Sequence, residues 1–369
     1  MTALLLIASS PGAGCAQEPS KSVANAPSFL RLFRQVGDFP LGAATSRLDY
    51  QSLDPATGRL YIAGMGAGKL LAFDIEYDRL ASSLNGYPKV TGVLAVPDLH
   101  KVYASVPGAG LIPSLSVALG MVGLSSGRGA VAIVDTRTLR EITRLPGGVF
   151  PDGIAYDPKD RRIFVSDELG SAVLVIDAAS NRLLARIATG GEVGNVRYDP
   201  ITAKVYAPIQ SRNELAVIDP ANLRLMAHRP LPGGEHPHGL AVTPDQPIGY
   251  IACDGNDRLL TVNLATGKVL DRQPVAHDPD VLAIDMEARR LYVASESGKL
   301  STFDITAATS PRSVGDVFVG RDAHSVAVDP ATHRLYFPLA DVKGRSVLRV
   351  LVPAGGKRLA QPTPSSPPK

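Results

Sequence analysis

Residues 150–187 read FPDGIAYDPKDRRIFVSDELGSAVLVIDAASNRLLARI and contain four short apolar runs separated by turn formers. The runs occupy residues 154–156, 162–165, 172–176 and 183–187. Short runs rich in Val, Ile, Leu and aromatic residues, bounded by Pro, Gly, Asn and Asp, are typical of β-strands joined by hairpins. Each run is too short to favour a helix. The stretch therefore predicts one four-stranded antiparallel unit.

The same unit recurs along the chain, and an aromatic residue in its second strand marks each copy. These residues are Tyr61, Tyr103, Phe164, Tyr206, Tyr250, Tyr292 and Tyr336, at intervals of 42, 61, 42, 44, 42 and 44 residues. A period of about 40–45 residues with four strands per repeat is the signature of a β-propeller. We therefore expect an all-β fold, a seven-bladed β-propeller with four antiparallel strands per blade.

The third strands of the copies share a pattern of apolar residues that ends in Asp or Asn. They read LLAFD at 70–74, VAIVD at 131–135, VLVID at 173–177, LAVID at 215–219, LLTVN at 259–263 and LSTFD at 300–304. This pattern resembles the YVTN-type repeats of bacterial β-propellers, including the YncE-like proteins, over roughly residues 45–352. The resemblance implies the fold but no single activity, because propellers serve as binding modules, lyases and hydrolases alike.

The N-terminal residues 1–16 combine a short apolar run with small residues, which is typical of an export signal. Gly12-Ala13-Gly14-Cys15 resembles a lipoprotein box, in which Cys15 would carry lipid, whereas cleavage after Ala16 would release a soluble protein. We expect an exported protein that is periplasmic, secreted or lipid-anchored, and Cys15 is its one expected link to a membrane. The alternative is a disordered apolar terminus on a cytosolic protein.

The remaining segments follow from the repeat. Residues 17–28 are polar and predict a loose linker, residues 29–353 predict the propeller, and the Pro- and Ser-rich residues 354–369 predict a disordered tail. The last copy supplies three strands but lacks a fourth, outer one. Residues 30–36 resemble that outer strand, so we predict that an N-terminal strand closes the last blade and leaves no unpaired end.

Composition excludes several classes of function. The net charge is +3, with no Trp and no run of Lys or Arg, so we expect no nucleic-acid partner. Cys253 is the one cysteine in the predicted propeller, which rules out an internal disulfide and favours a packing role. The chain has no P-loop, CxxCH or CxxC motif, so the corresponding chemistries and an attached redox cofactor have no support.

One insertion interrupts the period between Tyr103 and Phe164. Its residues 107–127 read PGAGLIPSLSVALGMVGLSSG, which is apolar and uncharged. Long loops of this kind are usually functional or disordered, and a disordered loop would be polar. We expect a lid or docking surface for a small molecule or a protein on one face of the propeller. The alternative is an insertion without function that folds onto the blade.

Polar residues stand at the start of each first strand, which lines the central channel of a propeller. The residues aligned with Asp152 are Asp49, Thr91, Asp152, Gly194, His238, Asp280 and His324. Two positions earlier stand Arg47, Lys89, Phe150, Glu192, His236, Asp278 and Asp322. Because the loops before the first strand and after the second fall on the same face, we expect these side chains to converge at one mouth of the channel, the face of the insertion.

Converging carboxylates raise one another's pKa unless a cation compensates their charge, and imidazoles with carboxylates suit a divalent metal ion. One divalent ion is therefore the cofactor that this ring could hold. The alternative is a wet polar channel whose aspartates cap turns. The candidate metal ligands are His238, Asp280 and His324, the candidate general bases are Asp152 and His236, and the candidate ligand-contacting residues are Asp49, Lys89, Glu192, Asp278 and Asp322.

Two functions remain open at this stage. The first is an exported, YncE-like scaffold that binds a ligand or a protein at the Asp/His-rich mouth. The second is a metal-dependent hydrolase or lyase, similar to lactonases, that uses the same cluster with the metal polarising a carbonyl or activating water. Metal content would separate the two.

Overall fold

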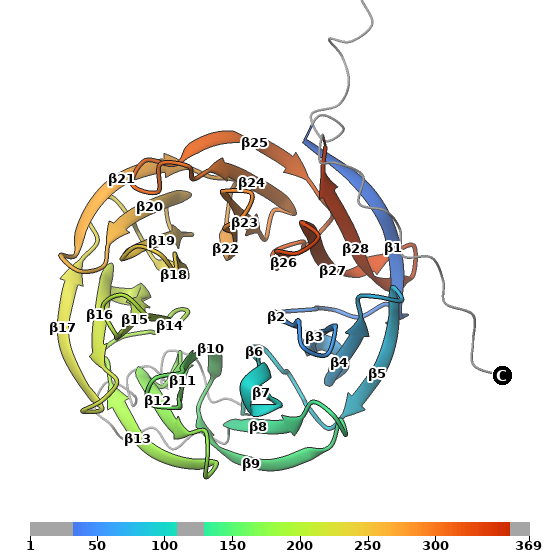
Figure 1. Cartoon of the computed structure of the whole chain (residues 1–369), viewed down its shortest axis with the longest axis horizontal. Helices are drawn as coiled ribbons and strands as arrows, with labels where there is room; N and C mark the ends of the chain where they lie inside the picture. The colour runs from blue at the N-terminus through green and yellow to red at the C-terminus, as the bar shows by residue number, and fades with distance from the viewer. Residues whose placement is uncertain (1–31, 109–128, 355–369) are drawn as a thin grey trace, which may run out of the picture.

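The computed structural model describes residues 32–108 and 129–354, which form a seven-bladed β-propeller (Figure 1). The predicted all-β fold with four antiparallel strands per blade is thereby confirmed. The predicted signal with Cys15, the linker, most of the insertion at 107–127 and the tail after residue 354 lie outside the described residues. In the part that is described, no helix is long and apolar enough to cross a membrane.

Each blade is one four-stranded sheet, numbered here from the inner strand outward in chain order. Blades 1 and 2 comprise β2 (Gln51–Asp54), β3 (Arg59–Gly64), β4 (Lys69–Asp74) and β5 (Arg79–Asn85), then β6 (Val93–Val96), β7 (Lys101–Val106), β8 (Gly129–Asp135) and β9 (Glu141–Gly148). Blades 3 and 4 comprise β10 (Pro151–Asp157), β11 (Arg162–Asp167), β12 (Ala172–Asp177) and β13 (Arg182–Ala188), then β14 (Arg197–Asp199), β15 (Lys204–Ile209), β16 (Glu214–Asp219) and β17 (Arg224–Pro230).

The second half of the ring repeats this order. Blades 5 and 6 comprise β18 (Pro237–Val242), β19 (Ile248–Cys253), β20 (Arg258–Asn263) and β21 (Lys268–Pro274), then β22 (Pro279–Asp285), β23 (Arg290–Ser295), β24 (Lys299–Asp304) and β25 (Arg312–Phe318). Blade 7 comprises β26 (Ala327–Asp329), β27 (Arg334–Val342), β28 (Arg345–Pro353) and, from the other end of the chain, β1 (Phe33–Ala43).

The N-terminal strand closes the ring, as predicted. β1 pairs antiparallel with β28, from Phe33 opposite Pro353 to Ala43 opposite Arg345 (Figure 1). The strand extends beyond the segment 30–36 that the sequence indicated, and two register shifts bend it along the outer edge. Arg349 of β28 holds Asp38 of β1 through two hydrogen bonds of 2.7 and 2.6 Å. Closure therefore combines a strand ladder with a bidentate ion pair.

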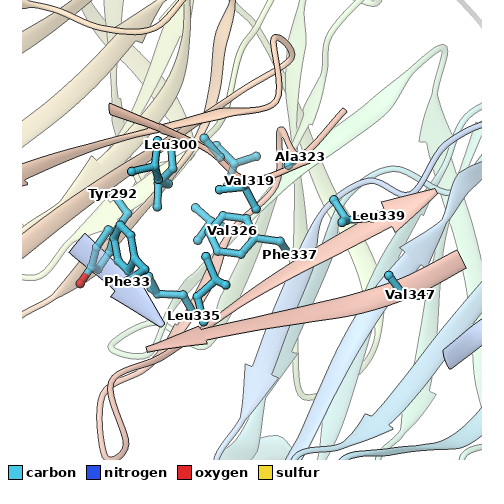
Figure 2. Packing of buried hydrophobic residues seen from close by; sticks show 14 of the residues in the cluster. Phe33, Tyr292, Leu300, Val319, Ala323, Val326, Leu335, Phe337, Leu339 and Val347 are labelled. Carbon is cyan, nitrogen blue, oxygen red and sulfur yellow. The ribbon is translucent and has the colours of Figure 1, made fainter. Parts of the chain in front are cut away.

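The hydrophobic core is divided into seven clusters, each between two neighbouring blades. Figure 2 shows the cluster between blades 6 and 7, where Phe33 of the closing strand packs with Tyr292, Val326 and Phe337. Both faces of every sheet are thus covered. The aromatic residue that marks each repeat is fully buried, and Cys253 is buried as well.

The repeated side chains also join neighbouring blades by hydrogen bonds. Arg59 donates to the Thr136 carbonyl at 2.6 Å, and Tyr250 donates to the Ala308 carbonyl at 2.8 Å. The Asp of the Asp-Pro turns accepts backbone N–H groups two and three residues on, as Asp54 does at 3.0 and 3.3 Å. The interpretation of these aspartates as turn residues is confirmed.

Candidate functional site

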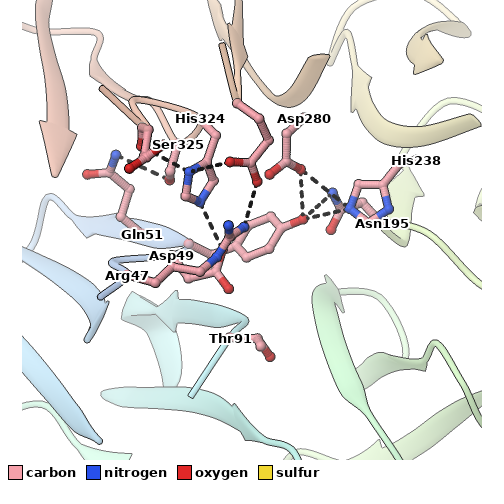
Figure 3. Close-up of polar contacts among 12 residues, drawn as sticks. Arg47, Asp49, Gln51, Thr91, Asn195, His238, Asp280, His324 and Ser325 are labelled. Atoms are coloured by element: carbon pink, nitrogen blue, oxygen red, sulfur yellow. Dashed lines mark hydrogen bonds and ion pairs between the residues drawn. The ribbon is translucent and has the colours of Figure 1, made fainter. Parts of the chain in front are cut away.

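The polar residues at the starts of the inner strands converge at one mouth of the ring, as Figure 3 shows. Asp49 lies just before β2, Asp280 is the second residue of β22, and His324 lies just before β26. His238 is the second residue of β18. Four neighbouring blades, numbers 5, 6, 7 and 1, therefore contribute one imidazole or carboxylate each.

Glycines let these strand starts approach one another. A Cβ on Gly92 would lie 1.8 Å from the carbonyl oxygen of Asp152, and one on Gly239 would lie 2.0 Å from that of Asp280. Gly194 has the same relation to His238, at 2.5 Å. No other residue fits against a neighbouring backbone at these distances. The glycines therefore set how closely the polar side chains of successive blades gather.

Asp49, Asp280 and His324 form the most compact polar group. One donor atom from each lies within 4.8 Å of the other two, as a metal site requires. All three are nearly inaccessible, with exposed fractions of 4%, 9% and 1%. Two carboxylates and one imidazole suit a divalent transition metal or zinc.

The orientation of His324 fits a ligand role. Its Nδ1 lies 3.0 Å from the Asp322 carbonyl oxygen and 3.4 Å from a Glu296 carboxylate oxygen. Nδ1–H therefore donates to these acceptors, and Nε2 faces Asp49 at 3.3 Å. A hydrogen bond that fixes one ring nitrogen of histidine commonly leaves the other free to bind a metal.

Tyr50 occupies the floor of the mouth. Its hydroxyl lies 2.9 Å from Nε2 of His238 and donates to Asp280 at 3.3 Å. The Asn195 amide donates to the same hydroxyl at 2.9 Å. Burial raises the pKa of Tyr50 well above its usual value, so the hydroxyl stays protonated.

On the opposite side, Arg47 brings a positive charge to the cluster. Its guanidinium lies 2.7 Å from Glu296 and 3.8 Å from Asp49. Glu296 thereby contacts both Arg47 and His324, and links a cation on blade 1 to the cluster. One arginine does not balance the carboxylates that gather here.

Burial changes the protonation of these carboxylic acids. It raises the pKa of Asp280, against the opposite effect of the His238 and His324 imidazoles. It also raises the pKa of Asp152 well above its usual value, and the neighbouring Glu168 carboxylate adds to that shift. The pKa of Glu168 is raised by burial too. The mouth is therefore crowded with carboxyl groups that lack sufficient positive charge.

The two imidazoles respond to that crowding. Burial alone would lower the pKa of His238, but the carboxylates of Asp280 and Glu168 outweigh it and raise the pKa to about 9. Burial also opposes protonation of His324, and the hydrogen bond that its Nε2–H donates to the Asp49 carboxylate leads the effects that raise its pKa. Protonated imidazoles thus balance part of the carboxylate charge. A bound dication can supply this positive charge instead, and its binding would release the imidazole protons.

The predicted site residues fall into two groups. Asp49, Asp152, His238, Asp280 and His324 surround the mouth. The predicted metal ligands were His238, Asp280 and His324, whereas the compact group consists of Asp49, Asp280 and His324. Asp49 was predicted to contact a ligand. His238 lies beside the compact group, with its Nε2 3.4 Å from Asp280.

The other predicted residues lie on the rim. Lys89 and Asp322 are exposed, and Glu192 and Asp278 are half-buried. His236 pairs with Asp254 at 2.6 Å. The structure does not place any of these five side chains in the compact group.

Several residues of the site escaped the sequence analysis. Tyr50 and Asn195 directly follow aligned positions of the ring. The fourth residue after each aromatic marker, where the second strand ends, is also polar in four successive blades: Glu168, Gln210, Asp254 and Glu296. Aligning the repeats at this position as well would have identified these four residues, because the loop after the second strand faces the same mouth.

Comparison with known proteins finds the same fold in solved structures but identifies no family for this chain. No family model matches the chain, and no curated protein does. Among solved structures, a Kuenenia stuttgartiensis hydrazine synthase chain aligns at 16% identity and a TM-score of 0.65, over 81% of this chain and 94% of its own. At 16% sequence identity, the likeness shows the propeller architecture alone.

Two further structures give the same result. A chain of the mitotic checkpoint complex aligns at 11% identity and a TM-score of 0.67, over 92% of this chain and 98% of its own. A streptogramin B lyase structure aligns at 13% identity and a TM-score of 0.68, over 87% of this chain and 98% of its own.

Proposed function

We propose that this chain is an exported ligand-binding propeller, similar to the YncE-like proteins, that recognises its ligand through a divalent cation held by Asp49, Asp280 and His324. The observation that carries the proposal is the approach of three donor atoms from blades 6, 7 and 1 to within 4.8 Å of one another. The arrangement is nearly buried, and neighbouring groups orient its imidazole.

The charge around the group supports a cation. Asp152 and Glu168 add two more carboxyl groups with raised pKa values to a mouth that already holds Asp280. A dication would favour their ionised forms and remove the need for protonated imidazoles. Three protein ligands also leave coordination positions for water or for an oxygen of a ligand, as in open metal sites.

Calorimetric titration of the chelator-treated full chain with Mn²⁺ and with Zn²⁺ tests the proposal. We expect one high-affinity site in the wild type and at least about a tenfold weaker affinity in Asp280→Asn and in His324→Gln. The matched controls are Asp316→Asn and His100→Gln, which alter exposed residues away from the mouth. Unchanged affinity in both ring variants would refute the cation site.

A second candidate function is metal-dependent hydrolysis or elimination. The contact between Tyr50 and His238 favours such an enzyme. The pair would place a proton donor and a proton acceptor next to a bound metal ion acting as a Lewis acid. Asp152, whose pKa is raised, is the candidate base at the mouth, while His236 is held by Asp254 on the rim. A similar structure is named as a lyase.

Assay of the metal-loaded chain with lactones and esters separates the two functions. A lyase or hydrolase would turn over a substrate in the wild type and lose turnover, while keeping bound metal, in His238→Gln. A binding protein would hold metal and ligand without turnover.

Export and docking complete the proposal. Lipid attachment predicts that labelled palmitate enters the wild type and not Cys15→Ser, whereas soluble export predicts an unlabelled protein in the medium or periplasm. A protein or small molecule would approach the mouth on the side of the insertion at 107–127.

A further inference from the structure

A cavity of about 410 Å³ lies inside the ring, on the other side of Tyr50 from the Asp/His mouth. We call it the axial cavity. Its walls come from the inner strands β2, β6, β10, β14 and β22, and include Leu94, Tyr156, Asn195, Arg197 and Tyr198. The cavity has the size of a small-molecule site and combines apolar and aromatic side chains with polar ones, among them Gln51, Ser52 and Asp98.

Arg197 is the distinctive group in this cavity. It begins β14, and its Nη1 donates to the neighbouring Val196 carbonyl at 2.8 Å. A guanidinium has five N–H donors, and within the described residues no carboxylate forms an ion pair with this one. Burial lowers the pKa of Arg197, against the opposite effect of the Tyr50 hydroxyl and the Asp152 carboxylate.

Two other partly buried arginines of the propeller are paired. Arg47 contacts Glu296 at 2.7 Å, and Arg334 contacts Asp78 at 3.0 Å. Arg197 is half-buried, and a guanidinium without an ion-pair partner can gain from pairing with an anion from another source.

Tyr50 and Asn195 separate the axial cavity from the metal-binding group. The two are hydrogen-bonded to each other, and both line the cavity. The carboxylates of the metal-binding group therefore lie on one side of this floor and the guanidinium lies on the other, where the exposed Asp98 also lines the cavity.

We propose that the axial cavity binds a small organic anion, a carboxylate with an apolar body, whose charged end pairs with Arg197. The aliphatic and tyrosine walls would bury the apolar body, and the guanidinium would bind the carboxylate through two parallel hydrogen bonds. This site does not depend on the cation proposed for the mouth.

Calorimetric titration of the chelator-treated full chain with benzoate and hexanoate tests the proposal, with benzamide and hexanamide as neutral counterparts. Chelation removes any metal that could bind a carboxylate. We expect at least one acid to bind about tenfold or more tightly than its amide. Arg197→Gln should abolish that preference, and Arg197→Lys should keep part of it. Arg224→Gln, on an exposed part of β17, is the matched control.

Three outcomes would overturn the proposal. The first is that neither acid binds the wild type. The second is equal binding of acids to the wild type and to Arg197→Gln. The third is binding that survives in Arg197→Gln but disappears in His238→Gln, which would assign the anion to the protonated imidazole at the mouth. A thermal unfolding curve for each variant verifies that the propeller is intact.

Discussion

The Tyr50 hydroxyl lies 2.9 Å from Nε2 of His238, and this contact joins the inner strands of blades 1 and 5 across the channel. The sequence separates the two residues by 188 positions. Because the same hydroxyl also contacts Asp280 and Asn195, one tyrosine links the metal-binding group to the axial cavity.

Tyr50→Phe should destabilise the fold by about 1–3 kcal/mol, because it leaves buried groups of His238 and Asn195 without their partner. Urea unfolding measures the change. The matched control is Tyr103→Phe, since the buried Tyr103 hydroxyl has no hydrogen-bond partner among the described residues. That control should stay within about 0.5 kcal/mol of the wild type. Equal costs for the two variants would contradict the role given to Tyr50.

Gly239→Ala should disturb the metal-binding group from a neighbouring blade. Its Cβ would lie 2.0 Å from the Asp280 carbonyl oxygen, so β22 must shift. We expect weaker cation binding and a loss of about 2 kcal/mol or more in stability. At Gly86 a Cβ would meet nothing within 4 Å and only the φ of 92° resists substitution, so Gly86→Ala should cost about 1 kcal/mol and leave cation affinity unchanged. Normal affinity in Gly239→Ala would show that the glycine does not position Asp280.

Arg349→Met should weaken the closure of the ring. It removes the bidentate contact with Asp38 on β1, which we expect to cost about 1–3 kcal/mol. Hydrogen exchange of the β1 amides should accelerate. Arg312→Met is the control, because Arg312 is 80% exposed and lies 3.6 Å from Asp304. It should change stability by less than about 0.5 kcal/mol. Unchanged exchange in Arg349→Met would mean that the strand ladder alone holds β1.

Acid should weaken the turns that end the third strands. Hydrogen bonds from Ser180 lower the pKa of Asp177 below its usual value, and the pKa values of Asp135, Asp219 and Asp304 are also lowered. A carboxylate whose folded-state pKa is depressed stabilises the fold above its unfolded pKa of about 4, and this contribution is lost as the pH falls below that value.

Asp177→Asn should therefore reduce the difference in unfolding free energy between pH 6 and pH 3. We expect a reduction of less than about 1 kcal/mol, because the turn is partly solvent-exposed. Thermal unfolding across this pH range measures it, with Asp316→Asn as an exposed control that should retain the wild-type profile. A steeper acid dependence in Asp177→Asn would reverse the sign argued here.

The fold could be predicted from the sequence because each blade repeats the same local signals. The turn aspartates, the aromatic markers and the apolar strands all recur with one period, so local and global preferences agree. The closing strand was harder to define, since β1 pairs with residues more than 300 positions away and its bounds depend on that pairing.

The site was only partly predictable. Register alone brought Asp49, Asp280 and His324 to one mouth, but it could not show which donor atoms lie close enough to share an ion. Tyr50 and Asn195 have no motif, because their importance comes from contacts across the channel. Arg197 has no motif either, since an unpaired guanidinium is recognised only when its surroundings are known.

Elemental analysis of the purified, tag-free full chain tests the central claim most directly. The cation site predicts about one equivalent of a divalent metal per chain, retained through gel filtration and lost when Asp280→Asn and His324→Gln are combined. Absence of bound metal from the wild type, even after incubation with Zn²⁺, Mn²⁺ and Ca²⁺, would contradict the claim. The mouth would then be a polar channel in which protonated histidines balance the carboxylates.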